Sequence, residues 1–233
     1  MINNIISLLR EILKEIEKNN PYELIGKGGT ILSVYYLNHR DSQDLDFDCS
    51  KENKNKDFEG YFKSIFEIVT KSHNLTYKIT KKASTSGSGR FHMNVTFSTY
   101  KDLPQTKMEI NFIDEVPKGL LSHGKLILYP LENLFYQKLS AFTDRKEIKD
   151  IIDVEMAVKS KSPAINHDKL KDFDNIKEMI NQAILIILHL EKNPAEWKQE
   201  FSSTELKFDV NEKNFPSFME KTKTDLHKLK NKF

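Results

Sequence analysis

The sequence lacks the features that would place it in a membrane or in an oxidising compartment. It contains one cysteine, Cys49, which excludes an internal disulfide framework and indicates a reducing compartment. Its longest apolar run, residues 183–188, is far shorter than the roughly 20 residues that a membrane span needs. The first residues have neither the basic start nor the apolar core of a secretion signal. We therefore expect a soluble cytoplasmic protein with no membrane partner, and the abundance of Lys, Asn and Ile suggests a bacterial source.

An excess of charge of one sign is also missing. The chain has 233 residues, of which 36 are Lys or Arg and 34 are Asp or Glu, so the formal net charge is +2. A protein that binds nucleic acid through bulk electrostatic attraction is therefore not the default expectation. Any phosphate ligand must be held by a local site. The length fits one large domain or two small ones.

The pattern of residues 1–125 predicts an α+β domain, in which a mixed or antiparallel sheet is flanked by helices. Apolar residues recur at helical spacing in three segments and alternate in five others. The predicted helices cover 2–18, 30–37 and 58–71, and the predicted strands cover 22–26, 44–48, 74–82, 90–98 and 107–113. The Ser- and Gly-rich residues 84–89 are predicted to connect two of these strands.

Residues 126–233 predict a helical bundle. Strand signals nearly vanish after Pro130, and helical periodicity covers residues 131–143, 147–159, 176–191 and 215–230. Trp197 and Phe201 are expected in the core rather than on a base-stacking platform. The lysines of residues 221–233 are either a contact for RNA phosphates or, as we favour, a solvated terminus.

Two carboxylates on one predicted strand are the most informative feature. Asp44 and Asp46 are separated by one residue, so on a strand they project from the same face. Such a pair is costly unless a cation lies between the two groups. Mg²⁺ prefers carboxylate, water and phosphate oxygens, with Mn²⁺ as the alternative ion. Two such ions about 3.5–4 Å apart stabilise the attacking and leaving oxygens of phosphoryl-type transfer.

A third carboxylate would complete such a site as a metal ligand or a base. Glu109 lies between apolar Met108 and Ile110 on a later strand, so it should point away from the side that they bury. Asp48 continues the face of Asp46, and Asp114 is a weaker competitor for the third position. Each of these residues taken alone is most often a solvated surface carboxylate. Their ordered combination favours a site.

A glycine pair precedes the carboxylates. Gly28 and Gly29 predict a turn that brings the backbone close to a ligand, and the following helix would present N–H groups to a phosphate. Thr30 and Ser33 lie on one face of its first turn and could add hydroxyl contacts. A glycine pair alone is usually a plain turn, so this assignment depends on the Asp-x-Asp strand that follows.

A basic stripe is predicted in the second region. Lys138, Arg145 and Lys149 are spaced seven and four residues apart, offsets that would lie on one face if the helix were continuous. Lys138 lies within an apolar set, so it must either extend to solvent or meet an anion such as a triphosphate. Asp150 and Asp153 follow one helical turn apart. They either orient the basic residues or simply pair with them.

These residues together resemble a known family. The segment from Gly28-Gly29-Thr30 to Ser33, followed by Arg40-x-Ser42-x-Asp44-Leu45-Asp46, is similar to the AbiEii/AbiGii toxin family of nucleotidyltransferases in the DNA polymerase β-like superfamily. Lys138, Arg145, Lys149-Asp150 and Asp153 resemble its second block, and Glu109 fits its third-carboxylate strand. The resemblance covers residues 20–158.

The resemblance implies a nucleotidyltransferase domain joined to a helical domain. It also implies a toxin of a toxin–antitoxin or abortive-infection system, with a cognate antitoxin protein as partner and, in some relatives, the 3′ end of tRNA as acceptor. It assigns Asp44 and Asp46 to metal, and Gly28, Gly29, Thr30, Ser33, Lys138 and Arg145 to the nucleotide. Asp153 would be either catalytic or structural.

Three functions remain open from the sequence. The leading hypothesis is a Mg²⁺-dependent nucleotidyltransferase, in which Asp44, Asp46 and Glu109 hold metal and Lys138, Arg145 and Lys149 neutralise an NTP. The alternative is a GTP- or nucleotide-binding module that regulates a partner protein without turnover. Metal-dependent phosphodiester hydrolysis is the third, and the Gly-Gly-Thr segment argues against it.

Overall fold

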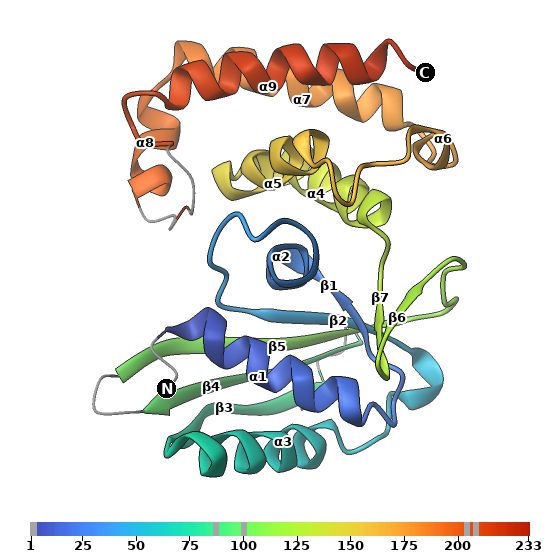
Figure 1. Ribbon diagram of the computed structural model, residues 1–233, viewed down its shortest axis with the longest axis vertical. Coiled ribbons are helices and arrows are strands. Elements are labelled where there is room, and N and C mark those ends of the chain that lie inside the picture. Colours follow the sequence, from blue (N-terminus) through green and yellow to red (C-terminus); the bar gives the residue numbers. More distant parts are fainter. Residues whose placement is uncertain (1–3, 86–88, 99–101, 203–205, 207–209) are drawn as a thin grey trace. The chain divides into compact units, whose positions relative to one another are not determined.

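The computed structural model describes residues 4–85, 89–98, 102–202, 206 and 210–233, and the chain divides into two compact units (Figure 1). Unit 1 comprises residues 1–34 and 42–130. Unit 2 comprises residues 35–41 and 131–233. Residues 35–41, which precede the Asp-x-Asp strand in the sequence, therefore belong with the helical unit and not with the first region.

Unit 1 contains a seven-stranded mixed sheet. Its order is β3-β4-β5-β2-β1-β7-β6, and the β2–β5 and β1–β7 pairs are parallel while the other neighbours are antiparallel. The strands are β1 (Ile25–Lys27), β2 (Leu45–Ser50), β3 (Thr76–Thr85), β4 (Arg90–Ser98), β5 (Asp102–Ile113), β6 (Leu121–His123) and β7 (Leu126–Leu128). Strand β2 therefore lies between β1 and β5, in the interior of the sheet.

The helices of unit 1 begin and end at residues suited to those positions. Helix α1 (Ile5–Lys18) begins after Asn4, whose side chain accepts a hydrogen bond from the Ser7 amide at 2.9 Å. Helix α3 (Phe58–His73) is capped by Asp57 and ends at Asn74, which has the left-handed conformation that often closes helices. A short 3₁₀ turn, η2 (Lys51–Asn53), lies between β2 and α3.

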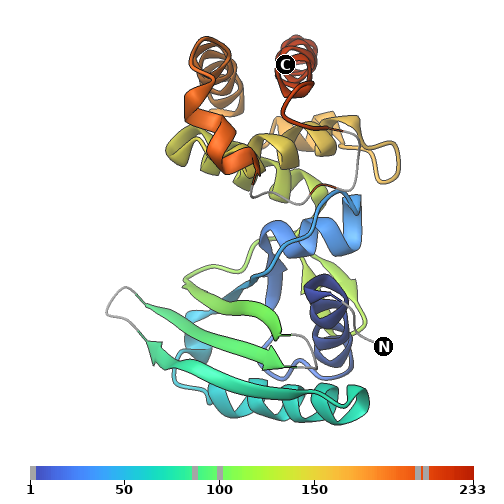
Figure 2. The same cartoon turned by 90° about the vertical axis from the view of Figure 1, so that its left-hand side faces the viewer.

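One face of the sheet is covered by helices α1 and α3 (Figure 2). The alternation of β2 buries Leu45, Phe47 and Cys49 on that side. Phe62 of α3 packs against Phe47 and Phe91 with ring centroids 6.2 Å apart in both cases. Burial of this apolar face fixes the register of β2, because a slip of one residue would exchange its buried and polar side chains.

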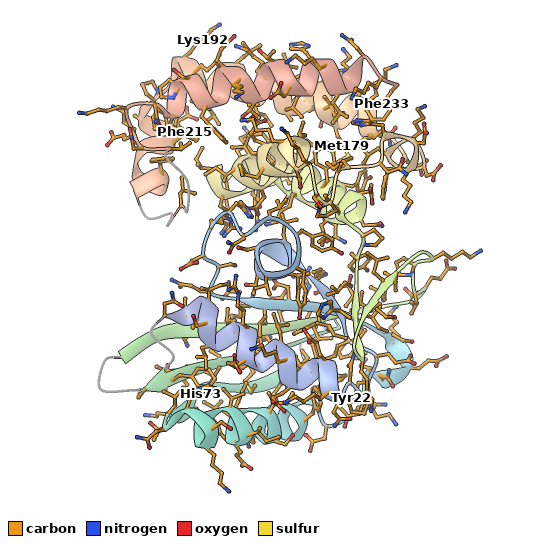
Figure 3. All side chains as sticks on the ribbon, viewed as in Figure 1. Tyr22, His73, Met179, Lys192, Phe215 and Phe233 are labelled. Atoms are coloured by element: carbon orange, nitrogen blue, oxygen red, sulfur yellow. The ribbon has the colours of Figure 1, made fainter. Side chains whose placement is uncertain are left out.

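Unit 2 is helical. Helix α4 packs against α5 and α7, and α9 packs against α5 and α7. Phe215, labelled in Figure 3, begins α9 and packs on Trp197 and Phe201 of α8 at 4.8 and 4.6 Å. The helices are α4 (Leu131–Arg145), α5 (Ile148–Lys159), α6 (His167–Leu170), α7 (Ile176–Lys192), α8 (Ala195–Ser202) and α9 (Phe215–Lys230).

The predicted α+β class with a helical second region is confirmed. Strands β6 and β7 and helices α6 and α8 were not predicted, because each is too short to show a clear period. Gly28 and Gly29 do not form a separate turn but begin α2 (Gly28–Ile31), which continues into the π-helical segment η1 (Leu32–Leu37). Within the described residues, no helix is both long and apolar enough to span a membrane.

The packing of α3 gives a stability prediction. Phe62 has no exposed area, whereas Ile68 of the same helix is 49% exposed. Phe62→Ala should therefore lower the free energy of unfolding by about 3–5 kcal/mol, through lost burial and the cavity left behind. The matched variant Ile68→Ala should change it by less than about 0.5 kcal/mol. Chemical denaturation followed by circular dichroism measures both, and equal losses would contradict the described core.

Candidate active site

A row of charged side chains crosses the sheet of unit 1 on the face opposite α1 and α3. Asp46 of β2 is register-paired with Lys27 of β1 on one side and with Glu109 of β5 on the other. Directly paired residues on neighbouring strands share a face, and neighbouring strands lie about 4.8 Å apart. The sheet therefore brings Asp46 and Glu109 together, although they are far apart in the sequence.

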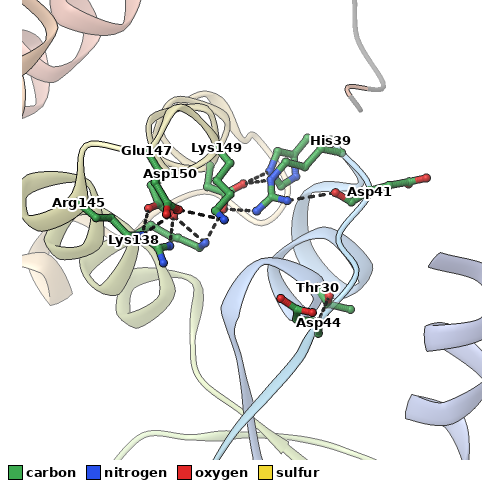
Figure 4. A network of polar contacts seen from close by, with 11 residues as sticks. Thr30, His39, Asp41, Asp44, Lys138, Arg145, Glu147, Lys149 and Asp150 are labelled. Atoms are coloured by element: carbon green, nitrogen blue, oxygen red, sulfur yellow. Dashed lines mark hydrogen bonds and ion pairs between the residues drawn. The ribbon is translucent and has the colours of Figure 1, made fainter. Parts of the chain in front are cut away.

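Asp44 is anchored immediately before β2. Its carboxylate Oδ1 accepts a hydrogen bond from the Lys107 amide at 3.2 Å, and its carbonyl accepts one from the Thr30 hydroxyl (Figure 4). Thr30 and Ser33 are fully buried. The Thr30 hydroxyl thus connects α2 to the residue at which the carboxylate strand begins, and its contact with phosphate stays a prediction.

Gly28 lies against the Asp46 carboxylate. Its φ is +78°, and a Cβ built on it would approach Asp46 Oδ2 to 2.4 Å. Both the left-handed conformation and the close approach are available to glycine at no steric cost. Gly28 and the carboxylate strand, which the sequence only places in order, are therefore in contact in the structure.

Glu109 is held in a cationic environment. Its carboxylate pairs with Lys107 Nζ and lies 3.7 Å from Arg90 Nη1. Burial alone would raise the pKa of Glu109, but Lys107, with smaller contributions from Arg90 and Lys27, lowers it below the usual value. Glu109 is therefore ionised at neutral pH and is a weak base.

A second charged network lies in unit 2 (Figure 4). Lys138 of α4 is 8% exposed, and its Nζ lies 3.0 Å from Asp150 Oδ1 and 2.8 Å from Asp153 Oδ2. Burial alone would lower the pKa of Lys138, but the two carboxylates outweigh it and raise the pKa. The sequence allowed this lysine either to extend to solvent or to meet an anion. The structure shows the second outcome, and the anions are the two carboxylates of α5.

The other basic residues of the stripe are partly exposed. Arg145 contacts Asp150 through Nε at 2.7 Å and through Nη2 at 2.9 Å, and its side chain is 46% exposed. Lys149 Nζ lies 3.0 Å from Glu147 Oε2 and is 43% exposed. Asp150 therefore pairs with both Lys138 and Arg145, which explains why a fully buried carboxylate is tolerated there.

Asp153 is the centre of this network. It is fully buried and accepts from Arg40 at 2.7 and 2.8 Å and from His39 Nε2 at 2.6 Å. Burial alone would raise its pKa, but Lys138 and Arg40 hold it well below the usual range. A carboxylate in this state does not accept a proton at physiological pH, so Asp153 holds the surrounding side chains in place.

The structure places the residues predicted for the site in two groups. Gly28, Gly29, Thr30, Ser33, Asp44, Asp46 and Glu109 belong to unit 1, and Lys138, Arg145, Lys149 and Asp153 belong to unit 2. Sequence reasoning missed Lys27 and His39 and did not assign Arg40 a role. Arg40 stands within the recognised motif, and Lys27 directly precedes the glycine pair, so each had a local signal; His39 had none.

The donors fit a divalent cation that is shared with a substrate. Among the described side chains, no group of three or more His, Cys, Asp or Glu forms a ready metal-binding cluster. Asp44 and Asp46 nevertheless offer carboxylate oxygens, and Mg²⁺ is commonly held by one or two carboxylates together with substrate phosphates. These residues therefore suit an ion that arrives with a nucleotide.

The mixed sheet, with Gly28 against Asp46, agrees with the class of nucleotidyltransferases that the sequence resembles. The description "Nucleotidyl transferase AbiEii toxin, Type IV TA system" belongs to the family whose profile matches residues 12–224. The chain belongs to this family of toxins of toxin–antitoxin systems, and it is an enzyme of the nucleotidyltransferase type.

Two solved structures share the fold. JHP933 from Helicobacter pylori is 21% identical, with 97% of this chain and 91% of that chain covered and a TM-score of 0.59. An H. pylori protein described as a nucleotidyltransferase is 20% identical, with 97% and 94% covered and a TM-score of 0.66. No curated protein matches the sequence.

The contact between Gly28 and Asp46 gives a prediction with a matched control. Gly119 has nearly the same φ, +75°, but a Cβ there would meet nothing within 4 Å. Gly28→Ala and Gly119→Ala should each lose about 1–2 kcal/mol of stability from left-handed strain. Only Gly28→Ala should also impair nucleotide transfer, because its methyl group displaces the Asp46 carboxylate. Equal transfer by the two variants would show that this contact is unimportant.

The buried histidine of unit 2 gives a pH prediction. The Nε2 of His39 donates to Asp153, and its buried Nδ1 has no hydrogen-bond partner among the described residues. Burial lowers the pKa of His39, with Arg40 and Lys138 acting in the same direction and Asp153 opposing them. A lowered folded-state pKa means that stability from this group is present above pH ~6.5 and is lost as the pH falls below it.

We therefore expect the free energy of unfolding to fall below pH ~6.5 by at most about 1.4 kcal/mol per pH unit from this group. His39→Gln keeps a donor for Asp153 and should remove that part of the pH dependence. Asp153, whose pKa is lowered, contributes a loss only below pH ~4. Urea denaturation between pH 4.5 and 8 tests this, and an unchanged slope in His39→Gln would contradict it.

Proposed function

We propose that this protein transfers a nucleoside monophosphate from an NTP to an acceptor hydroxyl, with the 3′ end of an RNA such as tRNA as the acceptor. The observation that carries the proposal is the contact of Gly28 with Asp46, in a sheet that also pairs Asp46 with Glu109. It supports a site in which the Gly28 backbone lies beside the carboxylates of Asp46 and Glu109. We place the activity in the cytoplasm and regard a cognate antitoxin protein as its regulator.

Asp44 and Asp46 would hold the divalent ion, Mg²⁺ or Mn²⁺, with Glu109 as the third carboxylate. When bound, such an ion neutralises phosphate charge and supports the attacking and leaving oxygens of the transfer. The acceptor oxygen forms a bond to the α-phosphorus, the bond from that phosphorus to the β-phosphate oxygen breaks, and pyrophosphate leaves. The proton of the acceptor hydroxyl passes to solvent, because the lowered pKa of Glu109 makes it a poor base.

The chain's own residues would act mainly by positioning. The Asp46 carboxylate lies against the backbone of Gly28, and Thr30 fixes the backbone of Asp44. Contact of Gly28 and Gly29 with the phosphates stays a prediction. The assignment of Lys138, Arg145 and Lys149 to nucleotide binding stays a prediction. Asp153, because it is buried and bonded to Arg40 and His39, is proposed as a positioning residue rather than a catalytic one.

The test is a transfer assay with each α-labelled NTP, Mg²⁺ and total bacterial RNA. The double variant Asp44→Asn, Asp46→Asn should lose at least about 100-fold in label transfer, because metal stabilisation of the transition state is worth several kcal/mol. The matched control is Asp114→Asn, which removes a carboxylate of unit 1 that pairs with Lys51 and is 77% exposed. It should transfer at the wild-type rate.

Three results would redirect the proposal. Transfer that survives in the double variant would show that these carboxylates are not the metal site. Tight GTP binding in isothermal titration, without pyrophosphate release from any RNA or protein pool, would favour the nucleotide-binding module. Shortened rather than lengthened RNA would favour hydrolysis.

A further inference from the structure

Lys27 lies beside both the glycine pair and the carboxylates of the proposed site in unit 1. It is the last residue of β1 and directly precedes Gly28. Its register partner on β2 is Asp46, so its side chain projects from the face that carries the carboxylates. Its charge also contributes to the lowered pKa of Glu109, two strands away. Neither the motif nor the proposed mechanism gives this lysine a role.

A second carboxylate holds Lys27 in this position. The Nζ of Lys27 pairs with Asp48 Oδ1, and the hydroxyl of Tyr129 donates to Asp48 Oδ2 at 2.6 Å. Burial and the neighbouring Asp48 raise the pKa of Tyr129, so this hydroxyl keeps its proton and remains a donor. Asp48 is thus fixed by two partners, which explains a carboxylate that is 5% exposed within an interior strand.

The ammonium of Lys27 retains the capacity to bind an anion. An ammonium has three donors, and the bond to Asp48 uses one of them. The Lys27 side chain is 18% exposed, whereas that of Asp48 is 7% exposed, so solvent reaches the cation more than its partner. Lysine acts as a compact point charge and suits phosphate oxygens whose exact placement changes during a reaction.

We propose that Lys27 is a polyphosphate-binding residue, which contacts the triphosphate of the NTP while Asp48 and Tyr129 fix its position beside Gly28 and Asp46. This inference rests on the proposed function for the identity of the ligand. It assigns Asp48 to holding the cation, not to the metal. The competing view is an ion pair that only joins β1 to β2.

Binding of inorganic tripolyphosphate in the presence of Mg²⁺, measured by isothermal titration, tests this without requiring turnover. Lys27→Met should weaken binding by about tenfold or more, since a hydrogen bond to a charged group is lost. Lys27→Arg should restore part of the affinity. The matched control is Lys51→Met, which removes another ion-paired lysine of unit 1, one that contacts Asp114 and is 54% exposed. It should bind as the wild type does.

Asp48→Asn separates the two roles. Asn keeps an oxygen that accepts from Lys27 Nζ and so preserves its position, while it removes the negative charge. If Lys27 binds phosphate, affinity should therefore equal or exceed that of the wild type. A pair that is only structural should show the same loss in Asp48→Asn as in Lys27→Met. The double variant Lys27→Met, Asp48→Asn shows whether any gain of affinity in Asp48→Asn depends on Lys27. Thermal unfolding of each variant confirms that it is folded.

Wild-type affinity in Lys27→Met, or no binding of tripolyphosphate by the wild-type protein, would overturn the inference. Failure of the proposed function has a different signature. Label transfer would then be absent, or would be equal in the wild type and in the double variant of Asp44 and Asp46, while the tripolyphosphate affinities of the Lys27 variants would still differ. The two outcomes are therefore distinguishable.

Discussion

Strand β2 has a buried apolar face and a charged face, and the arrangement of unit 1 depends on that alternation. Leu45, Phe47 and Cys49 bury one side beneath the helices, which directs Asp46 and Asp48 to the other side. Because β2 is an interior strand, its neighbours β1 and β5 supply Lys27 and Glu109 at the same level. Burial of the apolar face by the hydrophobic effect thereby holds Asp46 and Glu109 close together, although their charges repel.

Charge pairing within each unit is the second constraint. In unit 1, Lys107 pairs with Glu109, and Lys27 pairs with Asp48. In unit 2, Lys138 pairs with both Asp150 and Asp153, and Arg40 holds Asp153 as well. A buried charge is tolerated only when it is paired and hydrogen-bonded, so these partners constrain one another. Lys138 and Arg145 of the basic stripe therefore join α4 to α5, whereas Lys149 lies on α5 and pairs with Glu147 at the surface.

The proposed chemistry follows from what remains exposed in unit 1. Asp46 lies against Gly28, where the absence of a Cβ allows the carboxylate to approach the backbone closely. Lys27 adds a cation on the same face, and Thr30 fixes Asp44, the residue just before the carboxylate strand. A triphosphate with its metal ion matches this set of a lysine, close backbone and carboxylates. The site thus depends on three chain segments that only the sheet brings together.

The sequence by itself determined the class of fold and most of the long helices, because period and side-chain type are local properties. A face shared by Asp44 and Asp46 stays a prediction, since Asp44 precedes β2. It also placed Trp197 and Phe201 in the core, as the structure confirms. It could not determine that residues 35–41 belong with unit 2, nor that Lys138 meets Asp150 and Asp153 rather than solvent. Those outcomes, like the pairing of Lys27 with Asp48, depend on strand order and helix packing between residues distant in the chain, which only the tertiary structure decides.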